Sequence, residues 1–304
     1  MSETCPVTTL DAGAHARPRA GIAFVVVAVL LFSLYDAVSK WLTADYSPWQ
    51  IMLFRGLFGL VPIVAYVLAA RGPIELRSGQ PVLQLVRAAL GLGTNVLFIM
   101  AYRDMPLADA VAIGHAAPIF IVLLSVPLLA EPVGLRRASA ALVGFLGVLL
   151  IVQPGTGLLS SGAPYALGGT LCYALLLIST RRLGLSDSAF CTAACSNVVY
   201  VLGCAAIVPR VWVTPDLPDL GLLAATGLLG GTAMLLFAHA YRHGEAALLA
   251  PFDYTALLWA GLFGFVVWGD LPGPLVMAGM AVVAGSGMFL LRRERPRPFR
   301  PAAP

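Results

Sequence analysis

The sequence predicts an all-α integral membrane protein, with ten transmembrane helices arranged as two inverted five-helix repeats. Its 304 residues are 59% hydrophobic and only 11% charged, whereas charged residues make up roughly a quarter of a soluble domain. Segments such as 21–34 and 140–152 are apolar on every face, which is typical of helices in lipid. Two stretches of the chain also align on each other without a gap, which indicates an internal duplication.

The duplication is clearest at two Ala-Tyr-Arg triplets, at 101–103 and 240–242. The same offset makes three further pairs, namely Leu123 with Leu262, Glu131 with Asp270 and Gly134 with Gly273. We therefore expect a cytoplasmic N-terminal tail (1–20), a first repeat (21–153), a second repeat (163–291) and a basic cytoplasmic tail (292–304).

The spans follow from the breaks between apolar segments. Each span needs about 20 mainly apolar residues, and Pro, Gly and charge clusters mark its ends. In the first repeat the predicted spans are 21–42, 48–70, 81–101, 106–129 and 138–152. In the second repeat they are 164–180, 189–208, 220–241, 246–268 and 274–291.

The net charge of +4 comes mainly from arginines, and these collect on one side of the predicted bundle. That side holds Arg17, Arg19, Arg71, Arg77, Arg136, Arg137, Arg181, Arg182, Arg242, Arg292, Arg293, Arg295, Arg297 and Arg300. The other side has little beyond Arg103 and Arg210, with Lys40 near its boundary. Basic loops stay in the cytoplasm, so we expect both termini there and the protein in a cell membrane such as a bacterial inner membrane. Five spans per repeat is an odd number, so the second repeat enters the bilayer in the opposite sense.

The C-terminal tail and the cysteines have plain expected roles. The tail mixes arginines with prolines, and it is expected to contact anionic lipid, with a Pro-rich partner motif as the alternative. Cys172, Cys191, Cys195 and Cys204 fall inside predicted spans and are expected to be small packing residues. Cys191 and Cys195 also share a helix face, which leaves a thiol pair open.

Charged residues inside the first three spans need a reason, because each costs at least about 2.5 kcal/mol at the centre of a span. Asp36 and Lys40 are four residues apart, so they either neutralise each other or act separately, Asp36 in a solute pathway and Lys40 as an anchor or a gate. Arg55 suits carboxylate recognition or a pair with Asp36. Arg87 is expected to snorkel to the membrane edge. Asn95 lies deeper and either joins two helices or binds a ligand.

The fourth and ninth spans carry the other candidate site residues. Pro118 is expected to kink the fourth span beside His115, which either bonds a neighbouring helix or carries a coupling proton. The repeat alignment places Asp253 and Tyr254 opposite this kink. Asp253 is expected to act in transport or in a structural pair, and Tyr254 to line a cavity or to pack. Asn197 is the neutral counterpart of Arg55, so any role of Arg55 is not duplicated.

These features resemble the EamA branch of the drug/metabolite transporter superfamily. The first part of the resemblance is the span 31–42 with Asp36 and Lys40, followed by Pro48 and Arg55. The second is the stretch 131–134, followed by Gly144, Gly147 and Pro154. The resemblance implies two inverted five-helix repeats and alternating access, and it covers about 21–291.

The leading functional hypothesis is therefore secondary transport of a small polar metabolite, amino-acid-like or related, through Asp36, Lys40, Arg55, Asn95, His115, Asn197, Asp253 and Tyr254. Proton coupling is the default driving force, because no phosphate-binding loop for ATP is present. An intramembrane enzyme and a non-transporting scaffold are the alternatives, although no catalytic or metal site is expected. The expected partners are the solute and membrane lipid, with a homodimer as one option and without nucleic acid or a cofactor.

Overall fold

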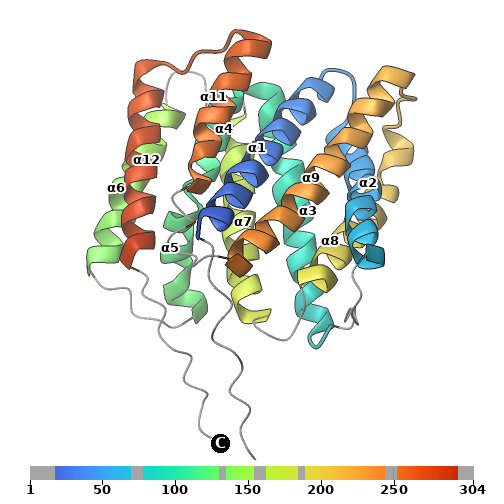
Figure 1. Cartoon of the computed structure of the whole chain (residues 1–304). Helices are drawn as coiled ribbons and strands as arrows, with labels where there is room; N and C mark the ends of the chain where they lie inside the picture. The colour runs from blue at the N-terminus through green and yellow to red at the C-terminus, as the bar shows by residue number, and fades with distance from the viewer. Residues whose placement is uncertain are drawn as a thin grey trace, which may run out of the picture.

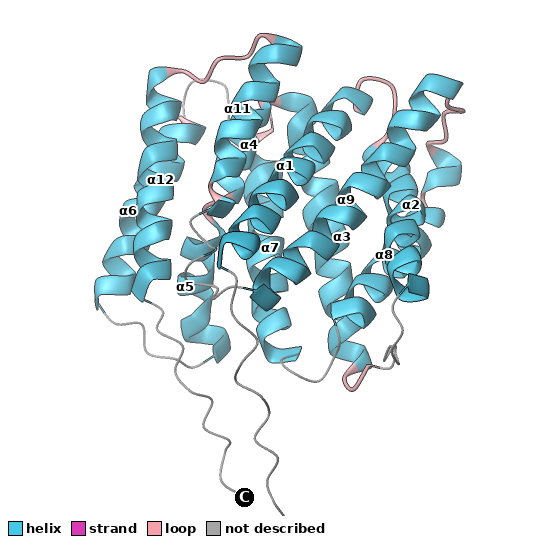
Figure 2. Ribbon diagram, viewed as in Figure 1, coloured by secondary structure: helices cyan, strands magenta, loops and turns pink. Residues whose placement is uncertain are grey.

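A computed structural model describes residues 18–69, 78–129, 135–153, 162–183, 189–243, 249 and 252–293. Most of the predicted tails, Glu131, Gly134, Pro154 and the loop arginines Arg71 and Arg77 lie outside these residues. The described part contains helices and connecting loops and no strand (Figure 2). The helices stand side by side in one upright bundle (Figure 1).

Most of the helices lie close to the predicted spans, but α11 begins only at Thr255, whereas the ninth span was expected from 246. In the first half they are α1 (Pro18–Leu42), α2 (Pro48–Ala69), α3 (Pro81–Asp104), α4 (Leu107–Gly114), α5 (Ala117–Leu129) and α6 (Leu135–Val152). In the second half they are α7 (Ala163–Leu183), α8 (Ala189–Ala205), the 3₁₀ helix η2 (Val208–Arg210), α9 (Leu217–His243), α11 (Thr255–Trp268) and α12 (Pro274–Arg293). Pro48, Pro81 and Pro274 each occupy the first helical position, where a missing N–H is harmless.

The protein is a multi-pass membrane protein by the length and composition of these helices. Seven helical segments of the described residues are long and apolar enough to cross a membrane, with α4 and α5 counted together as Leu107–Leu124. Three shorter apolar helices accompany them, at Ser139–Val152, Thr255–Trp268 and Pro274–Phe289. Many large apolar side chains point away from the protein, such as Leu68, Val82, Leu142 and Leu258, as expected for a surface in lipid.

The fourth predicted span is broken where the sequence predicts a kink. Helix α4 ends at Gly114, His115 and Ala116 form a turn, and α5 begins at Ala117. Pro118 cannot donate to the Gly114 carbonyl, so the helix loses its regular ladder at this point. The break lets His115 leave the α4 axis, and this is the main local feature that positions the site.

The bundle is held by contacts between the two halves of the chain. Helix α1 packs on α9, α3 packs on α7, α2 packs on α8 and α9, and α6 packs on α12. The approach of α2 to α9 is very close, because a Cβ atom on Gly227 would lie 2.6 Å from the backbone nitrogen of Gly59.

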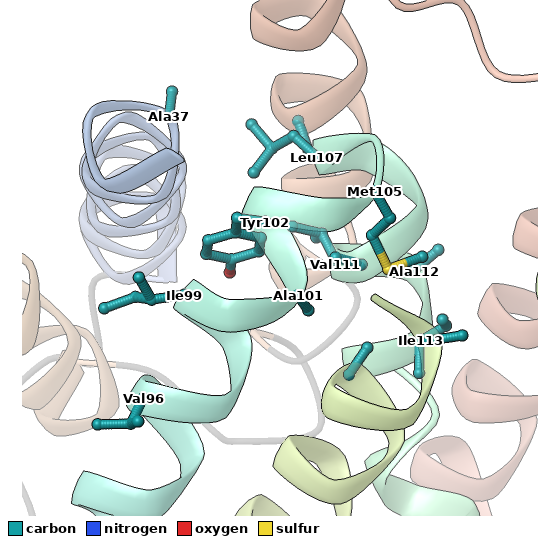
Figure 3. Packing of buried hydrophobic residues seen from close by; sticks show 14 of the residues in the cluster. Ala37, Val96, Ile99, Ala101, Tyr102, Met105, Leu107, Val111, Ala112 and Ile113 are labelled. Carbon is teal, nitrogen blue, oxygen red and sulfur yellow. The ribbon is translucent and has the colours of Figure 1, made fainter. Parts of the chain in front are cut away.

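The largest buried core surrounds the turn between α3 and α4. Ile99, Leu107 and Ile113 are fully buried there, and Tyr102 and Met105 pack beside them (Figure 3). This core lies towards the end of the bundle that carries residues 43–47, 105–106, 206–216 and 269–273, which is the upper end in Figure 1. We refer to it as the upper end.

Candidate functional site

A cavity of about 230 Å³ lies between helices of both halves. Its lining comes from α1, α3, α4, α5, α7 and the start of α11: Asp36, Thr94, Phe98, Tyr102, Val111, Gly114, His115, Ala117, Pro118, Tyr173, Leu177 and Tyr254. Three of the predicted site residues, Asp36, His115 and Tyr254, are therefore brought together. The aromatic lining residues Phe98, Tyr102 and Tyr173 were not predicted as site residues, because aromatic side chains on membrane helices usually serve packing.

Asp36 is the carboxylate of this cavity. It lies in the upper half of α1, and its side chain interacts with the hydroxyl of Tyr102 on α3. It is also close enough to Arg55 on α2 to be stabilised by the guanidinium charge. The Asp36 carboxylate thus faces the cavity with one hydroxyl partner and one positive charge nearby.

His115 joins the break between α4 and α5 to the start of α11. Its Nδ1 lies 2.9 Å from the Val111 carbonyl oxygen, and its Nε2 lies 3.3 Å from the Asp253 carbonyl oxygen. Its ring centroid is 5.2 Å from that of Tyr254. A neutral imidazole has one N–H and can donate to one of these carbonyl oxygens, whereas an imidazolium can donate to both. The Val111 oxygen also accepts the His115 backbone N–H at 3.1 Å.

Asp253 and Tyr254 have different places in this group. Tyr254 lines the cavity, whereas Asp253 contributes its backbone carbonyl to His115 and its carboxylate interacts with the His115 charge. The Tyr254 hydroxyl lies where a Cβ atom of residue 287 would be, so the glycine at 287 on α12 makes room for this side chain. Gly287 therefore helps to fix the position of the ring against His115.

Arg55 is held next to the cavity by two aromatic rings. Its guanidinium carbon lies 4.8 Å from the centre of the Tyr35 ring and 5.5 Å from the centre of the Tyr200 ring. Its Nε is buried and has no hydrogen-bond partner in the described part of the chain. Asn95 belongs to the same group, because its Oδ1 accepts a hydrogen bond of 3.3 Å from the Tyr35 hydroxyl.

Asn197 does not reach the cavity. Its side chain is buried, donates to the Ala193 carbonyl on its own helix and packs against Gly59 of α2. Asn197 was expected to line the solute pathway, but the close crossing of α2 and α8 encloses its amide away from the cavity.

Lys40 pairs with the second half of the chain rather than with Asp36. Its Nζ lies 3.5 Å from Asp270 Oδ2, donates to the Met105 carbonyl at 2.9 Å and sits 5.0 Å from the centre of the Trp268 ring. Lys40 lies in the last turn of α1, so its long side chain extends towards the upper end and away from Asp36.

The backbone after α11 brings Asp270 to this lysine. Gly269 adopts a left-handed conformation with φ of 74°, and Asp270 N–H bonds back to the Gly264 carbonyl. This glycine-closed helix end fixes where Asp270 leaves α11. Asp109 on α4 supplies a second carboxylate whose charge acts on Lys40, and its Oδ1 is buried without a partner among the described residues.

Two further hydrogen-bonded contacts close the same end. Gln50, which is fully buried, donates to the Val213 carbonyl at 2.6 Å and accepts from the Val213 N–H at 3.0 Å. The Tyr46 hydroxyl donates to Asp219 at 2.8 Å. Burial and this carboxylate raise the pKa of Tyr46 to about 12, so the hydroxyl keeps its proton at neutral pH.

Arg87 is enclosed by neighbouring helices and does not extend outwards as snorkelling requires. It is buried, and its Nε and Nη1 donate to Thr180 of α7 at 2.8 Å and to Ser196 of α8 at 3.0 Å. The prediction of snorkelling was wrong because these two hydroxyls, which only the helix packing brings near, hold the guanidinium inside. The sulfur atoms of Cys191 and Cys195 lie 3.9 Å apart and form no disulfide with each other.

The comparisons with known proteins agree with a transporter. Residues 19–153 match the EamA-like transporter family. The pseudopaline exporter of Pseudomonas aeruginosa is 28% identical over 91% of this chain and 98% of its own length. The riboflavin transporter of Rhizobium johnstonii is 28% identical over 94% and 96% of the two chains. The S-adenosylmethionine uptake transporter of Rickettsia prowazekii is 22% identical over 90% and 93%.

A solved crystal structure also has a similar fold. It superposes with a TM-score of 0.61 and 21% sequence identity, and the match covers 90% of this chain and 98% of that one. The likeness therefore extends over almost the whole bundle.

Proposed function

Because this chain carries an EamA-like transporter family domain over residues 19–153, we propose that it is a secondary-active transporter of a small, amino-acid-like polar metabolite. It works by alternating access, with ten spans in two inverted repeats and both termini in the cytoplasm of a bacterial cell. The observation that carries the proposal is the cavity, which holds Asp36 and His115 inside a bundle of membrane helices.

The helix pairs support the inverted repeats. If the halves are exchanged, α1 takes the place of α7 and α3 takes the place of α9. The contact between α1 and α9 then becomes the contact between α7 and α3, and both contacts are present. The same exchange turns the pair of α2 and α8 into itself, and likewise the pair of α6 and α12, and both contacts are present. A pseudo-two-fold axis in the membrane plane produces this relation.

The upper end is the closed gate of the proposed cycle. Lys40 ties α1 to Asp270 after α11 and to Met105 after α3, directly above cavity residues such as Tyr102. Release of these contacts would let the two halves separate at this end. The arginines predicted on the opposite side favour an upper end that faces away from the cytoplasm.

His115 is the proposed carrier of the coupling proton. Its two carbonyl contacts come from α4 and from the start of α11, so protonation ties the two halves together at the cavity wall. Loss of one proton removes one of these hydrogen bonds and loosens that link. The other titratable groups that line the same cavity are Asp36 from α1, Tyr102 from α3, Tyr173 from α7 and Tyr254 just before α11, and the Asp253 carboxylate interacts with His115 next to it.

The relatives do not fix the solute. Their printed names cover pseudopaline, riboflavin and S-adenosylmethionine, and they include an exporter and uptake transporters. A metabolite with both charges is favoured here because a carboxylate, an imidazole and a nearby guanidinium surround one space. The names are those of transporters and not of enzymes, and of the two aspartates considered for an enzyme only Asp36 lines the cavity.

The test is uptake into proteoliposomes across a panel of amino acids, nucleosides and vitamins, with and without a proton gradient. We expect at least one solute to accumulate and Asp36→Asn to reduce its uptake at least tenfold. Asp104→Asn, which changes an exposed carboxylate at the end of α3, is the matched control and should have no effect. Uptake that is indifferent to Asp36→Asn would remove the cavity from the mechanism, and indifference to Asp253→Asn would remove that carboxylate.

A further inference from the structure

The guanidinium of Arg55 is a buried cation with an unused hydrogen-bonding edge. Tyr35 and Tyr200 lie against it with their ring faces, at 4.8 and 5.5 Å from the guanidinium carbon. These contacts stabilise the positive charge but do not accept its N–H groups through oxygen. The Tyr200 hydroxyl interacts with it, yet Arg55 Nε has no partner among the described residues.

A buried guanidinium is stabilised by an anion that pairs with it. A guanidinium carries five N–H donors in a planar fork that matches a carboxylate with two parallel hydrogen bonds. Lys40 has Asp270 at 3.5 Å, but in the described part of the chain no carboxylate lies within ion-pair distance of Arg55. The charge of Asp36 acts on Arg55 from farther away, and Nε stays without an acceptor among the described residues.

A glycine lets helix α9 pack closely on this guanidinium. Helix α9 passes Arg55 at Gly230, where a Cβ atom would come within 3.3 Å of Nε and 3.4 Å of Nη2. The ring of Tyr35 is fixed in turn by its hydroxyl, which bonds Asn95 on α3. The guanidinium is thus oriented by aromatic rings, and position 230 of α9 presents no side chain to it.

From this geometry we infer that Arg55 is a subsite for the carboxylate group of the transported solute. The inference rests on the proposed transport function and names its substrate class. The carboxylate binds the Arg55 fork between Tyr35 and Tyr200, and the solute amine lies towards Asp36. Tyr35 and Asp36 are consecutive residues of α1, so one turn of one helix presents the aromatic wall to Arg55 and the carboxylate to the cavity. The class is therefore α-amino acids and their derivatives with a free carboxylate.

The experiment compares matched solutes in proteoliposome counterflow. Each amino acid, and S-adenosylmethionine, is paired with a derivative that lacks the carboxylate, and riboflavin serves as a carboxylate-free solute of different shape. We expect the wild-type protein to move at least one carboxylated member at least tenfold faster than its partner. Arg55→Gln should lower that uptake at least tenfold and bring the ratio within the pair close to one. Arg55→Lys keeps the charge but loses the fork, so it should raise the KM for the carboxylated solute while retaining the preference in part.

The controls separate the subsite from folding and from the proposed function. Arg103→Gln removes an exposed arginine at the end of α3 and should leave both the rate and the preference unchanged. If Arg55→Gln does not fold, the wild-type preference and the Arg55→Lys KM decide the question. Equal transport of carboxylated and carboxylate-free solutes, or a preference that survives Arg55→Gln, would overturn the subsite and leave transport itself intact. If the wild-type protein moves no solute of the panel, the proposed function fails and the subsite fails with it.

Discussion

The contacts of Lys40 at the upper end predict how strongly two different substitutions open access to the cavity. Lys40→Met removes a charge-assisted hydrogen bond to the Met105 carbonyl, a half-exposed ion pair with Asp270 and a cation–π contact with Trp268. Such terms contribute about 1.5–3, 0.2–1 and 0.5–1 kcal/mol respectively, and they are not additive.

We therefore expect Lys40→Met to weaken the closed state by about 2–3 kcal/mol, or roughly 30- to 150-fold in the equilibrium constant. Asp270→Asn removes only the ion pair, whose carboxylate is 36% exposed, so its effect should be about 1 kcal/mol or less. Lys40→Met should therefore weaken the closed state more than Asp270→Asn does, because the hydrogen bond to the Met105 carbonyl contributes more than the ion pair.

The assay is labelling of a single cysteine in the cavity. In a background without the five native cysteines, Val111→Cys places a thiol in the cavity lining, where the native side chain is only 8% exposed. A membrane-impermeant maleimide is added from the upper side, and Asp45→Cys, at an exposed loop position, reports which side that is. Labelling of the cavity thiol should be at least tenfold faster with Lys40→Met and at most a few-fold faster with Asp270→Asn. Equal rates in all three proteins, with normal labelling at position 45, would refute the gating role of Lys40.

Three other changes test the remaining contacts. His115→Asn leaves at most one of the two carbonyl contacts and removes the proposed proton carrier, so the dependence of transport on pH should flatten, as measured by uptake at fixed membrane potential. Gly287→Ala places a methyl group where the Tyr254 hydroxyl lies and should destabilise the protein by about 1–3 kcal/mol in thermal unfolding, with partial rescue by Tyr254→Phe. Arg87→Met removes two hydrogen bonds from a buried cation and should destabilise by about 2–4 kcal/mol, whereas Arg103→Met at an exposed site should stay within about 0.5 kcal/mol.

For each of these three substitutions, one result would contradict the role proposed for the residue. If transport by His115→Asn depends on pH as in the wild type, His115 does not carry the coupling proton. A Gly287→Ala protein as stable as the wild type, or no rescue in the double variant, would show that the Tyr254 ring is not fixed by α12. Equal stability losses for the two arginine variants would mean that the hydroxyls of Thr180 and Ser196 contribute nothing to holding Arg87.

Local chemistry along the chain is enough to predict the membrane class and most of the helix ends. Apolar length, together with prolines at the first position of α2, α3 and α12, places these helices without any tertiary information. The break beside His115 was also predictable, because Pro118 removes a specific backbone hydrogen bond whatever surrounds it. Asp36, His115 and Tyr254, which line the cavity, are conspicuous in the sequence because a charge, an imidazole and a phenol are unusual inside apolar helices.

Only the tertiary structure decided which polar groups meet. The sequence suggested Asp36 as a partner of Lys40 from their spacing on one helix, whereas the packed bundle offers Lys40 the nearer Asp270 and the Met105 carbonyl. Arg87 and Asn197 are likewise enclosed by neighbouring helices that no local pattern brings together. The reason is physical: hydrophobicity and backbone chemistry act along the chain and fix each helix, but a polar contact forms over a few ångströms between helices and depends on how they cross.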